Sequence, residues 1–376
     1  MEFVDLAAQQ RQILPGIEKR IAGVLAHGKY IMGPEVFELE AQLAAYTGVR
    51  HTVTCASGTD ALLMVLMALD IGPGDAVFTT PFTFVATAEV ICLLGATPVF
   101  VDVDPDTWNM DPAALETAVR QLGGEGEKKM PSLVPRCVVP VDIFGLPADY
   151  DAIHVVAGRY GLFVLEDAAQ SFGAAFRGRK AGSLAHAAAT SFFPAKPLGC
   201  YGDGGAVFTD DDGLVEKLVS IRVHGKGTHK YDNVRIGING RLDTIQAAVL
   251  LEKLRIFDNE LAARNQAAGL YRLLLEGRVA CQAVPKGFTS AWAQFSVLHK
   301  DRDAIMTVLR QQGIPTAIYY PRPLHCQTAF AHLGYAPDDF PVSLHLSRNI
   351  FSLPMHPYLT EADIRRICNL IQQDLT

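Results

Sequence analysis

Short apolar runs alternate with longer helix-forming stretches through the first two-thirds of this chain. Continuous apolar runs of this length are typical of strands buried in a parallel sheet. The predicted strands are residues 51–55, 76–79, 97–103, 137–141 and 162–165. Helical patterns at 58–69 and 86–94 separate the first three of them. This alternation predicts an α/β fold in which a mostly parallel central sheet carries helices on both faces.

The last third of the chain predicts a smaller α+β domain. A long helix is expected over 241–254, with helical pattern continuing towards residue 275. Beyond it we expect a strand near 293–299, a helix at 301–312 and a terminal helix that begins with a capping-box pattern at Thr360 and Asp363. The sequence therefore predicts a large domain of residues 1–250 and a small domain of residues 251–376. A polar, glycine-rich stretch between residues 121 and 135 is expected to be a mobile surface loop.

Composition narrows the possible partners and the compartment. The net charge of −7 argues against nucleic acid as a main partner, because binding to phosphates needs a basic face. The seven cysteines are scattered without metal-ligand spacing, which favours a reducing compartment and predicts neither a metal site nor a disulfide framework. The N-terminus is acidic where a signal peptide would be basic, and no uncharged run has membrane-spanning length. We expect a soluble cytoplasmic protein without a membrane partner.

Lys196 lies in the most informative segment of the chain. A short apolar strand, predicted at 191–193, leads into this lysine and then into a turn with four glycines, before a second strand at 206–209. Burial among apolar neighbours disfavours the ammonium form of a lysine. The neutral amine can then attack a carbonyl and form a Schiff base. Taken alone, the pattern favours a hairpin whose lysine simply points into water.

Two other segments place polar side chains where predicted strands end. Residues 56–60 join a strand to a helix N-terminus, where free N–H groups and the helix dipole bind anions. Gly58 lets a phosphate approach the backbone there, and Thr59 adds a hydroxyl donor. Asp167 and Gln170 follow the strand 162–165, at the sheet edge where ligands bind in open α/β folds. Taken separately, these residues also fit an ordinary helix cap and an acidic strand end.

Two aromatic rings are further candidates for binding a ligand at this edge of the sheet. Phe82 and Phe84 follow another predicted strand, and either ring can stack on a flat heterocycle or pack in the core. An anion-binding turn, an aromatic plate, an acid, a glutamine and a Schiff-base lysine are together the parts that hold pyridoxal phosphate. That cofactor needs a lysine for its aldehyde and an acid for its pyridinium nitrogen, so that the ring can withdraw electrons.

The order of these segments resembles the DegT/DnrJ/EryC1/StrS family of sugar aminotransferases over essentially the whole chain. The resemblance is carried by residues 33–36, 56–61, 83–87, 166–170, 191–196, 202–205 and 237–241. A narrower resemblance links the chain to the enzymes that aminate a UDP-linked 2-acetamido-3-oxo-hexuronic acid for surface polysaccharides. That resemblance is carried by residues 196–205, 241–244 and 352–358.

The resemblance implies a fold-type I pyridoxal-phosphate enzyme whose active sites lie at a homodimer interface. It implies that Lys196 binds the cofactor covalently and moves a proton during the reaction. Asp167 would pair with the pyridinium nitrogen, Gln170 with the ring hydroxyl, and Phe84 would stack on the ring. The residues implied to hold the phosphate are Gly58, Thr59 and Ser191, with Asn239 from the neighbouring subunit.

The expected substrate contacts are Arg241, Tyr319 and Tyr320. Arg241 closes a basic stretch, residues 222–241, most of whose basic side chains are expected to be solvated. Its guanidinium suits a bidentate grip on a carboxylate. Tyr319 stands where relatives usually carry a histidine that faces the sugar. A tyrosine donates a hydrogen bond but adds no positive charge at neutral pH. This departure weakens the uronate assignment, and nearby His325 is either a substitute or a structural histidine.

The sequence thus predicts transfer of an amino group from L-glutamate to UDP-2-acetamido-2-deoxy-3-oxo-glucuronic acid, for surface polysaccharides such as lipopolysaccharide. One alternative is a neutral 3- or 4-keto-6-deoxy nucleotide sugar as the substrate. Another is a non-catalytic regulator that binds pyridoxal phosphate. A sugar dehydratase of the same fold is disfavoured by Lys196, because those relatives carry a histidine there. A nicotinamide-dependent oxidoreductase is disfavoured because no G-x-G-x-x-G motif follows the first strand.

Overall fold

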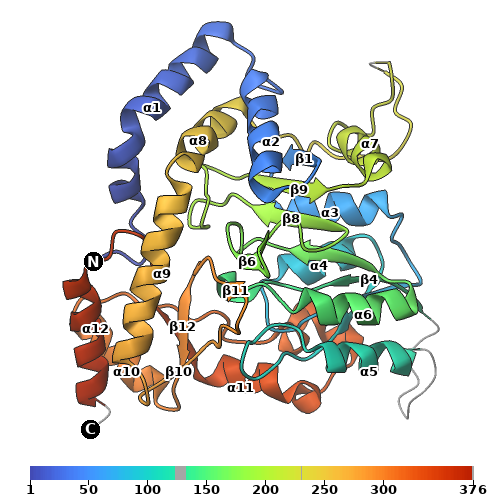
Figure 1. The fold of residues 1–376 in the computed structure, drawn as a ribbon. Coiled ribbons are helices and arrows are strands. Elements are labelled where there is room, and N and C mark those ends of the chain that lie inside the picture. The colour runs from blue at the N-terminus through green and yellow to red at the C-terminus, as the bar shows by residue number, and fades with distance from the viewer. Residues whose placement is uncertain (123–132, 230, 375–376) are drawn as a thin grey trace.

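A seven-stranded sheet forms the centre of the computed structural model, which describes residues 1–122, 133–229 and 231–374 (Figure 1). The strand order is β1-β9-β8-β5-β4-β2-β3. Strand β9 runs antiparallel to both of its neighbours, and the other six strands run in one direction. The bounds are β1 His51–Cys55, β2 Asp75–Thr79, β3 Thr97–Phe100, β4 Val134–Val139, β5 Phe163–Asp167, β8 Ala187–Ser191 and β9 Gly205–Thr209. The predicted mostly parallel sheet is confirmed.

Helices cover both faces of this sheet (Figure 1). On one face lie α2 (Pro34–Thr47), α5 (Pro112–Leu122), α6 (Tyr150–Tyr160) and α8 (Thr244–Leu254). On the other lie α3 (Gly58–Ala68), α4 (Ala86–Leu93) and α7 (Asp212–Ile221). Successive strand residues point to opposite faces, so in β5 Val164 packs against the first set of helices and Leu165 against the second. The same alternation sends the next two side chains of β5, Glu166 and Asp167, to opposite sides of the sheet.

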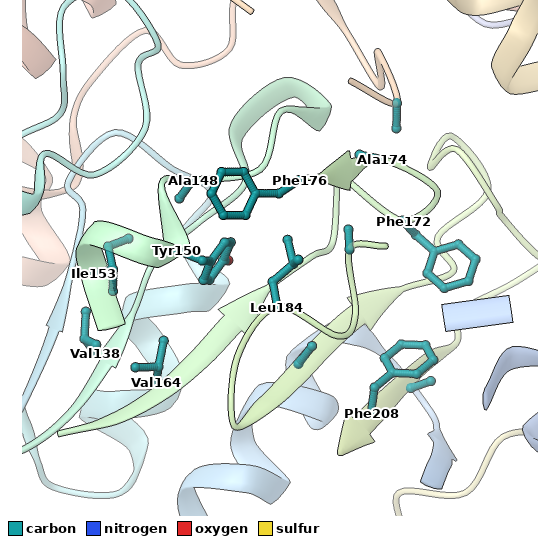
Figure 2. Close-up of a cluster of buried hydrophobic side chains, with 14 of the residues drawn as sticks. Val138, Ala148, Tyr150, Ile153, Val164, Phe172, Ala174, Phe176, Leu184 and Phe208 are labelled. Carbon is teal, nitrogen blue, oxygen red and sulfur yellow. The ribbon is translucent and has the colours of Figure 1, made fainter. Parts of the chain in front are cut away.

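Stacked aromatic rings fill one end of the larger core cluster. The Phe172 ring lies against those of Phe208 and Phe257, with centroid distances of 5.7 and 5.6 Å and nearly parallel planes. Figure 2 shows Phe172 and Phe208 at one end of the cluster and Tyr150, on α6, in its middle. Offset stacking of this kind stabilises a core beyond the area that the rings bury.

The C-terminal part of the chain has a core of its own. Strands β10 (Ala280–Cys281), β12 (Phe295–Leu298) and β13 (Ile350–Leu353) form an antiparallel sheet. This sheet packs with α9 (Phe257–Leu274), α10 (Arg302–Gln311) and α12 (Glu361–Asp374). Helix α9 is shared, because Phe257 and Leu261 pack in the first core and Ala268 and Tyr271 in the C-terminal one. The domain boundary at residue 250 stays a prediction.

The remaining elements connect these two parts. Helix α1 (Leu6–His27) packs along α8, and its Arg20 pairs with Glu252 at 2.5 Å. The N-terminus lies beside α12 (Figure 1). The Met355 N–H donates to the Phe3 carbonyl. The other elements are β6 Ala175–Phe176, β7 Arg179–Lys180, β11 Phe288–Thr289, α11 Pro341–Asn349, and the short helices η1 Ile143–Gly145, η2 Leu324–Cys326, η3 Thr328–Leu333 and η4 Pro337–Asp339.

Local signals explain where several elements begin. Ser57, Asp149 and Asp211 cap α3, α6 and α7 with side-chain oxygens that accept backbone N–H groups. The predicted capping box before α12 is confirmed, because Thr360 Oγ1 accepts from the Asp363 N–H while Asp363 accepts from the Thr360 N–H. No helix in the described ranges is long and apolar enough to cross a membrane.

Three predicted elements were wrong in their bounds. The strand predicted at 191–193 ends at Ser191, because Pro194 follows and the Phe192 N–H turns to the Gly204 carbonyl. The strand predicted at 97–103 stops at Phe100. The long helix from residue 241 is divided into α8 and α9, since Arg255 and Ile256 donate to carbonyls three residues back. The glycine-rich residues 123–129, predicted to form a mobile loop, lie outside the described residues.

Substituting Phe172→Ala should remove the central ring of the aromatic stack. Large-to-small changes at such buried aromatic positions cost about 3–5 kcal/mol. We expect a loss of this size in the free energy of unfolding, measured by urea titration. The matched control is Leu273→Ala, whose side chain is 68% exposed, and it should change stability by less than about 0.5 kcal/mol. Equal losses in the two variants would contradict the role of the stack.

Candidate active site

Parallel strands bring the predicted site residues to one edge of the sheet. Strands β1, β5 and β8 run in the same direction, so Cys55, Asp167 and Ser191 end them at this edge. The Ala168 N–H donates to the Ala189 carbonyl at 2.8 Å, which fixes the end of β5 against β8. Residues from distant parts of the sequence thus meet where open α/β sheets bind ligands.

The turn before α3 forms a nest of backbone N–H groups against Ser191. Ser57 caps the helix by accepting the Asp60 N–H at 3.0 Å, which leaves the N–H groups of Gly58 and Thr59 in the first turn without helical acceptors. A Cβ atom at residue 58 would lie 2.6 Å from Ser191 Cβ, so only glycine fits there. The structure therefore brings together Gly58, Thr59 and Ser191, the three own-chain residues predicted to hold a phosphate.

Asp167 is buried at the end of β5 and is hydrogen-bonded through both carboxyl oxygens. Thr87 Oγ1 donates to Oδ2 at 2.8 Å, and the Ala169 N–H donates to Oδ1 at 3.2 Å. Burial raises the pKa of this carboxyl group, while those two bonds and the charge of Lys196 act to lower it. A cationic ring nitrogen placed here would stabilise the carboxylate further.

Lys196 faces Asp167 from a loop that is closed by short hydrogen bonds. Phe192 donates its N–H to the Gly204 carbonyl, and its own carbonyl accepts the Cys200 N–H, each at 2.7 Å. Prolines flank the lysine at 194 and 197, which stiffens the segment. Burial lowers the pKa of the Lys196 ammonium, and the charge of Asp167 opposes this shift. The lysine is thus held in place with its neutral form favoured relative to a lysine in water.

Gln170 is oriented from both ends of its amide. Its Oε1 accepts the Phe144 N–H at 2.7 Å, and its Nε2 donates to the Tyr320 hydroxyl at 3.2 Å. Burial raises the pKa of Tyr320, so its hydroxyl stays protonated. Gln170 and Tyr320 therefore form one hydrogen-bonded unit close to Asp167, whose charge also acts on Tyr320.

The two candidate stacking rings have different environments. Phe82 is fully buried and lies edge-on to Phe144 and Tyr320. Phe84 is 55% exposed, and its centroid lies 6.4 Å from that of Tyr320. Only the Phe84 ring has a face open to a ligand, which agrees with its choice over Phe82.

Asn239 and Arg241 form a second group beside the nest. The Ala56 N–H donates to the Gly240 carbonyl at 3.0 Å, so this segment is tied to the turn that leads into α3. Asn239 is exposed and accepts a hydrogen bond from Arg241 Nη2. Arg241 Nε is buried and has no partner among the residues that the structure describes.

The other residues considered near the substrate, Tyr319 and His325, differ in their surroundings. Tyr319 is half-buried, with its ring near those of Phe3 and Tyr320, and burial raises the pKa of its hydroxyl. His325 does not replace the missing histidine, because it is buried against Phe340 and its Nε2 bonds the Pro337 carbonyl. Its role is structural.

Arg222, at the start of the basic stretch, is not solvated. Arg222 is buried, and its Nη1 donates to Glu40 at 2.5 Å and to the Thr54 carbonyl at 2.9 Å. Arg222 thus fixes the end of α7 to β1 rather than facing water. Sequence alone gave no signal for this, since its partner Glu40 is 182 residues away.

Sequence reasoning also missed residues that support the site. Thr87 opens an apolar helix and lies within a motif already singled out, but nothing in the sequence ties it to Asp167. A narrow pocket lined in part by Lys196 is also lined by residues near the N-terminus and by residues of the C-terminal part of the chain. Its lining includes Asp5, Gln9, Arg264, His356 and Tyr358.

The arrangement fits pyridoxal phosphate. The Gly58 cradle admits an anion, the exposed Phe84 ring offers a stacking face, and buried Asp167 suits a cationic nitrogen. Lys196 is the one group here able to bond an aldehyde. Within the described residues, no cluster of three or more His, Cys, Asp or Glu side chains has the arrangement of a metal site.

Two relatives of known name match nearly the whole chain. The UDP-2-acetamido-2-deoxy-3-oxo-D-glucuronate aminotransferase of Pseudomonas aeruginosa is 46% identical over 98% of both chains. The UDP-N-acetyl-3-dehydro-alpha-D-glucosamine 3-aminotransferase of Acidithiobacillus ferrooxidans is 41% identical over 99% of this chain and 97% of its own.

Two solved structures share the fold. A DegT/DnrJ/EryC1/StrS aminotransferase from Brucella abortus is 52% identical over 99% of both chains, with a TM-score of 0.95. NtdA of Bacillus subtilis, with its bound cofactor PMP, is 28% identical over 97% of this chain and 82% of its own, with a TM-score of 0.87. The sequence profile of one family matches residues 12–372. The chain belongs to the DegT/DnrJ/EryC1/StrS aminotransferase family.

Proposed function

We propose that this chain is a pyridoxal-phosphate-dependent aminotransferase that moves an amino group from L-glutamate to UDP-2-acetamido-2-deoxy-3-oxo-glucuronic acid, for surface polysaccharides. One observation carries the proposal: Lys196 faces buried Asp167 at the same sheet edge as the Gly58–Ser191 nest. A non-catalytic regulator has no need for a lysine whose neutral form is favoured.

Pyridoxal phosphate supplies an aldehyde that carries the amino group and a ring that withdraws electrons. The nest at Gly58, Thr59 and Ser191 would hold the phosphate of the cofactor. Asp167 would keep a proton on the ring nitrogen, and Gln170 would bond the ring hydroxyl. Lys196, as the neutral amine, would be the base that takes a proton from the amino-bearing carbon and returns it during transfer.

The carboxylate of the proposed sugar is assigned to Arg241. Its buried Nε has no partner in the described part of the chain. Its Nη2 donates to Asn239, which is only 2 residues away in sequence. A guanidinium with a free N–H edge suits a carboxylate. The 46% identity to the glucuronate enzyme supports the same substrate.

A neutral keto-sugar is the second candidate substrate. Tyr319 presents a protonated hydroxyl rather than a cationic ring, and the relative from Acidithiobacillus ferrooxidans acts, by its name, on a sugar without a carboxylate. The neutral 3- and 4-keto-6-deoxy nucleotide sugars fall in this class.

The active site is proposed to be shared between two subunits. Asn239 would reach the partner's phosphate site, because its side chain is exposed on the surface of its own chain. Ile236, three residues before Asn239, is 84% exposed, and Val234 on the same segment is 55% exposed. Exposed apolar side chains that gather in one place are typical of an interface.

The central test is transfer of labelled nitrogen from L-glutamate to a panel of UDP- and dTDP-linked keto-sugars, with and without a C6 carboxylate. We expect amination of the uronate by the wild type and none by Lys196→Ala, which also should lose the mass adduct left by borohydride reduction with cofactor. Cofactor binding without transfer to any sugar would support the regulator instead.

Arg241→Ala should discriminate between the two substrate classes. Losing a charge-assisted hydrogen-bonded grip costs about 1.5–3 kcal/mol, so kcat/KM for the uronate should fall roughly 10- to 100-fold. The neutral analogue should change by less than about threefold, which is under 1 kcal/mol. Arg241→Lys is the matched control and should recover part of the loss, because it keeps the charge but not the bidentate geometry. Equal losses on both sugars would remove the carboxylate role.

Mixed dimers test the sharing of the site. Lys196→Ala inactivates a subunit's own site, whereas Asn239→Asp should place a repelling charge at the partner's phosphate. Co-expressed in equal amounts, the two inactive variants should give about one quarter of wild-type activity, since half the dimers are mixed and each holds one intact site. Activity no higher than that of the separate variants would refute sharing through Asn239.

A further inference from the structure

A row of four aromatic rings leads from the exposed ring of the site to residue 3. The Phe84 centroid lies 6.4 Å from that of Tyr320, and the Tyr320 centroid lies 5.9 Å from that of Tyr319. The row ends at Phe3, whose centroid lies 6.2 Å from that of Tyr319. The ring planes are tilted or nearly perpendicular, as edge-to-face packing favours. Ring contacts thus join residue 3 to the side of the site where the sugar is proposed to bind.

The two tyrosines of this row are held in different ways. The Tyr320 hydroxyl accepts a hydrogen bond from Gln170 Nε2 at 3.2 Å. Burial raises the pKa of the Tyr319 hydroxyl, and no hydrogen bond from the described residues contributes to that shift. The half-buried Tyr319 ring packs against Phe3 on one contact and Tyr320 on another. Neighbouring rings therefore place Tyr319, and its hydroxyl is left for a ligand.

The segment that carries Phe3 is anchored to the C-terminal part of the chain. The Phe3 carbonyl accepts the Met355 N–H at 3.2 Å. Further along the segment, Asp5 Oδ1 accepts a backbone N–H at 2.8 Å and caps α1. Gln9 Nε2 then donates to both carboxyl oxygens of Glu260 on α9, at 2.8 and 3.0 Å, and both side chains are buried. The Phe3 ring therefore stands on a backbone that is fixed on both sides.

We propose that Phe3 is a positioning residue that fixes the Tyr319 hydroxyl for a hydrogen bond to the sugar substrate. This role rests on the proposed function of Tyr319 as a substrate contact. A phenol that donates one hydrogen bond must be held in distance and direction, because a hydrogen bond weakens steeply as it bends. Without the Phe3 ring, Tyr319 loses one of the rings that hold it, and its hydroxyl moves over a wider range.

The same segment also borders the lysine, so an effect on the sugar has to be separated from an effect on the cofactor. Residues 4–6 and Gln9 line the narrow pocket together with Lys196. The ring of Phe3, in contrast, contacts Tyr319. In the first half of the proposed reaction L-glutamate gives its amino group to the cofactor, and in the second half the keto-sugar receives it. Only the second half should depend on Phe3.

The experiment compares the full-length wild type with Phe3→Ala. Binding of UDP-2-acetamido-2-deoxy-glucuronic acid and of UDP-N-acetylglucosamine, which carry a hydroxyl in place of the 3-oxo group and cannot react, is measured by calorimetry. For the sugar that the wild type binds more tightly, Phe3→Ala should weaken binding about fivefold, the value of one neutral hydrogen bond. The KM for the matching keto-sugar should rise by the same factor while kcat stays unchanged. The rate at which L-glutamate alone converts the cofactor should also stay unchanged.

A double-mutant cycle shows whether Phe3 acts through Tyr319. Tyr319→Phe removes the hydroxyl and keeps the ring, so it should weaken sugar binding by at least as much as Phe3→Ala. In the Tyr319→Phe background, Phe3→Ala should have no further effect, because no hydroxyl is left to position. Additive losses in the double variant would overturn the proposal. Phe3→Tyr keeps an aromatic ring at residue 3 and should retain the wild-type affinity.

Two further variants complete the test. Phe3→Leu keeps an apolar side chain without a ring, should show the same loss as Phe3→Ala, and covers the case in which Phe3→Ala does not fold. Phe288→Ala is the matched control, because Phe288 is also half-buried and its ring contacts Phe176 at 4.6 Å, outside the row. It should bind the sugar as the wild type does. Wild-type affinity in Phe3→Ala and Phe3→Leu would refute the positioning role, whereas a wild type that aminates no keto-sugar would count against the proposed function instead.

Discussion

A buried carboxyl group that faces a lysine is the constraint on which the rest of this structure depends. Burial makes the charged form of each group costly, and each group makes the charge of the other less costly. Neither effect survives if the side chains drift apart or water enters. The strand end, the closed loop around Lys196 and the donors to Asp167 all serve to keep the two groups fixed.

Strand β5 combines this requirement with the needs of the fold. Its alternation gives Val164 and Leu165 to the two apolar cores, and then Glu166 and Asp167 to two polar environments on opposite faces. Glu166 satisfies backbone N–H groups, whereas Asp167 is left to a ligand. A shift of one residue in register would exchange these roles. The parallel pairing with β8 therefore keeps Asp167 on the side of the site as well as stabilising the sheet.

The fold was largely predictable because its signals are local. Apolar runs marked the buried strands, and Thr360 with Asp363 marked the start of α12. The wrong bounds arose where backbone hydrogen bonds across a loop decide the outcome, as at Phe192. In the site, Lys196 and Asp167 could be found as strand-end residues of suitable chemistry. Thr87 and Arg222 could not, because their roles depend on partners at sequence separations of 80 and 182 residues.

The two arginines that begin and end the basic stretch show how one segment can serve both the fold and a ligand. Arg222 donates to Glu40 and to the Thr54 carbonyl inside the chain, so its charge is already paired. Gly240 donates its N–H to the Arg222 carbonyl at 3.1 Å, so the segment between them leaves and returns at one anchored point. Arg241 follows Gly240 directly, so its backbone is held close to the same anchored point. Its Nε nevertheless has no acceptor within the described residues. A buried donor left open is costly unless something else accepts from it. Arg222 therefore serves the fold, whereas Arg241 keeps a donor from which a ligand could accept.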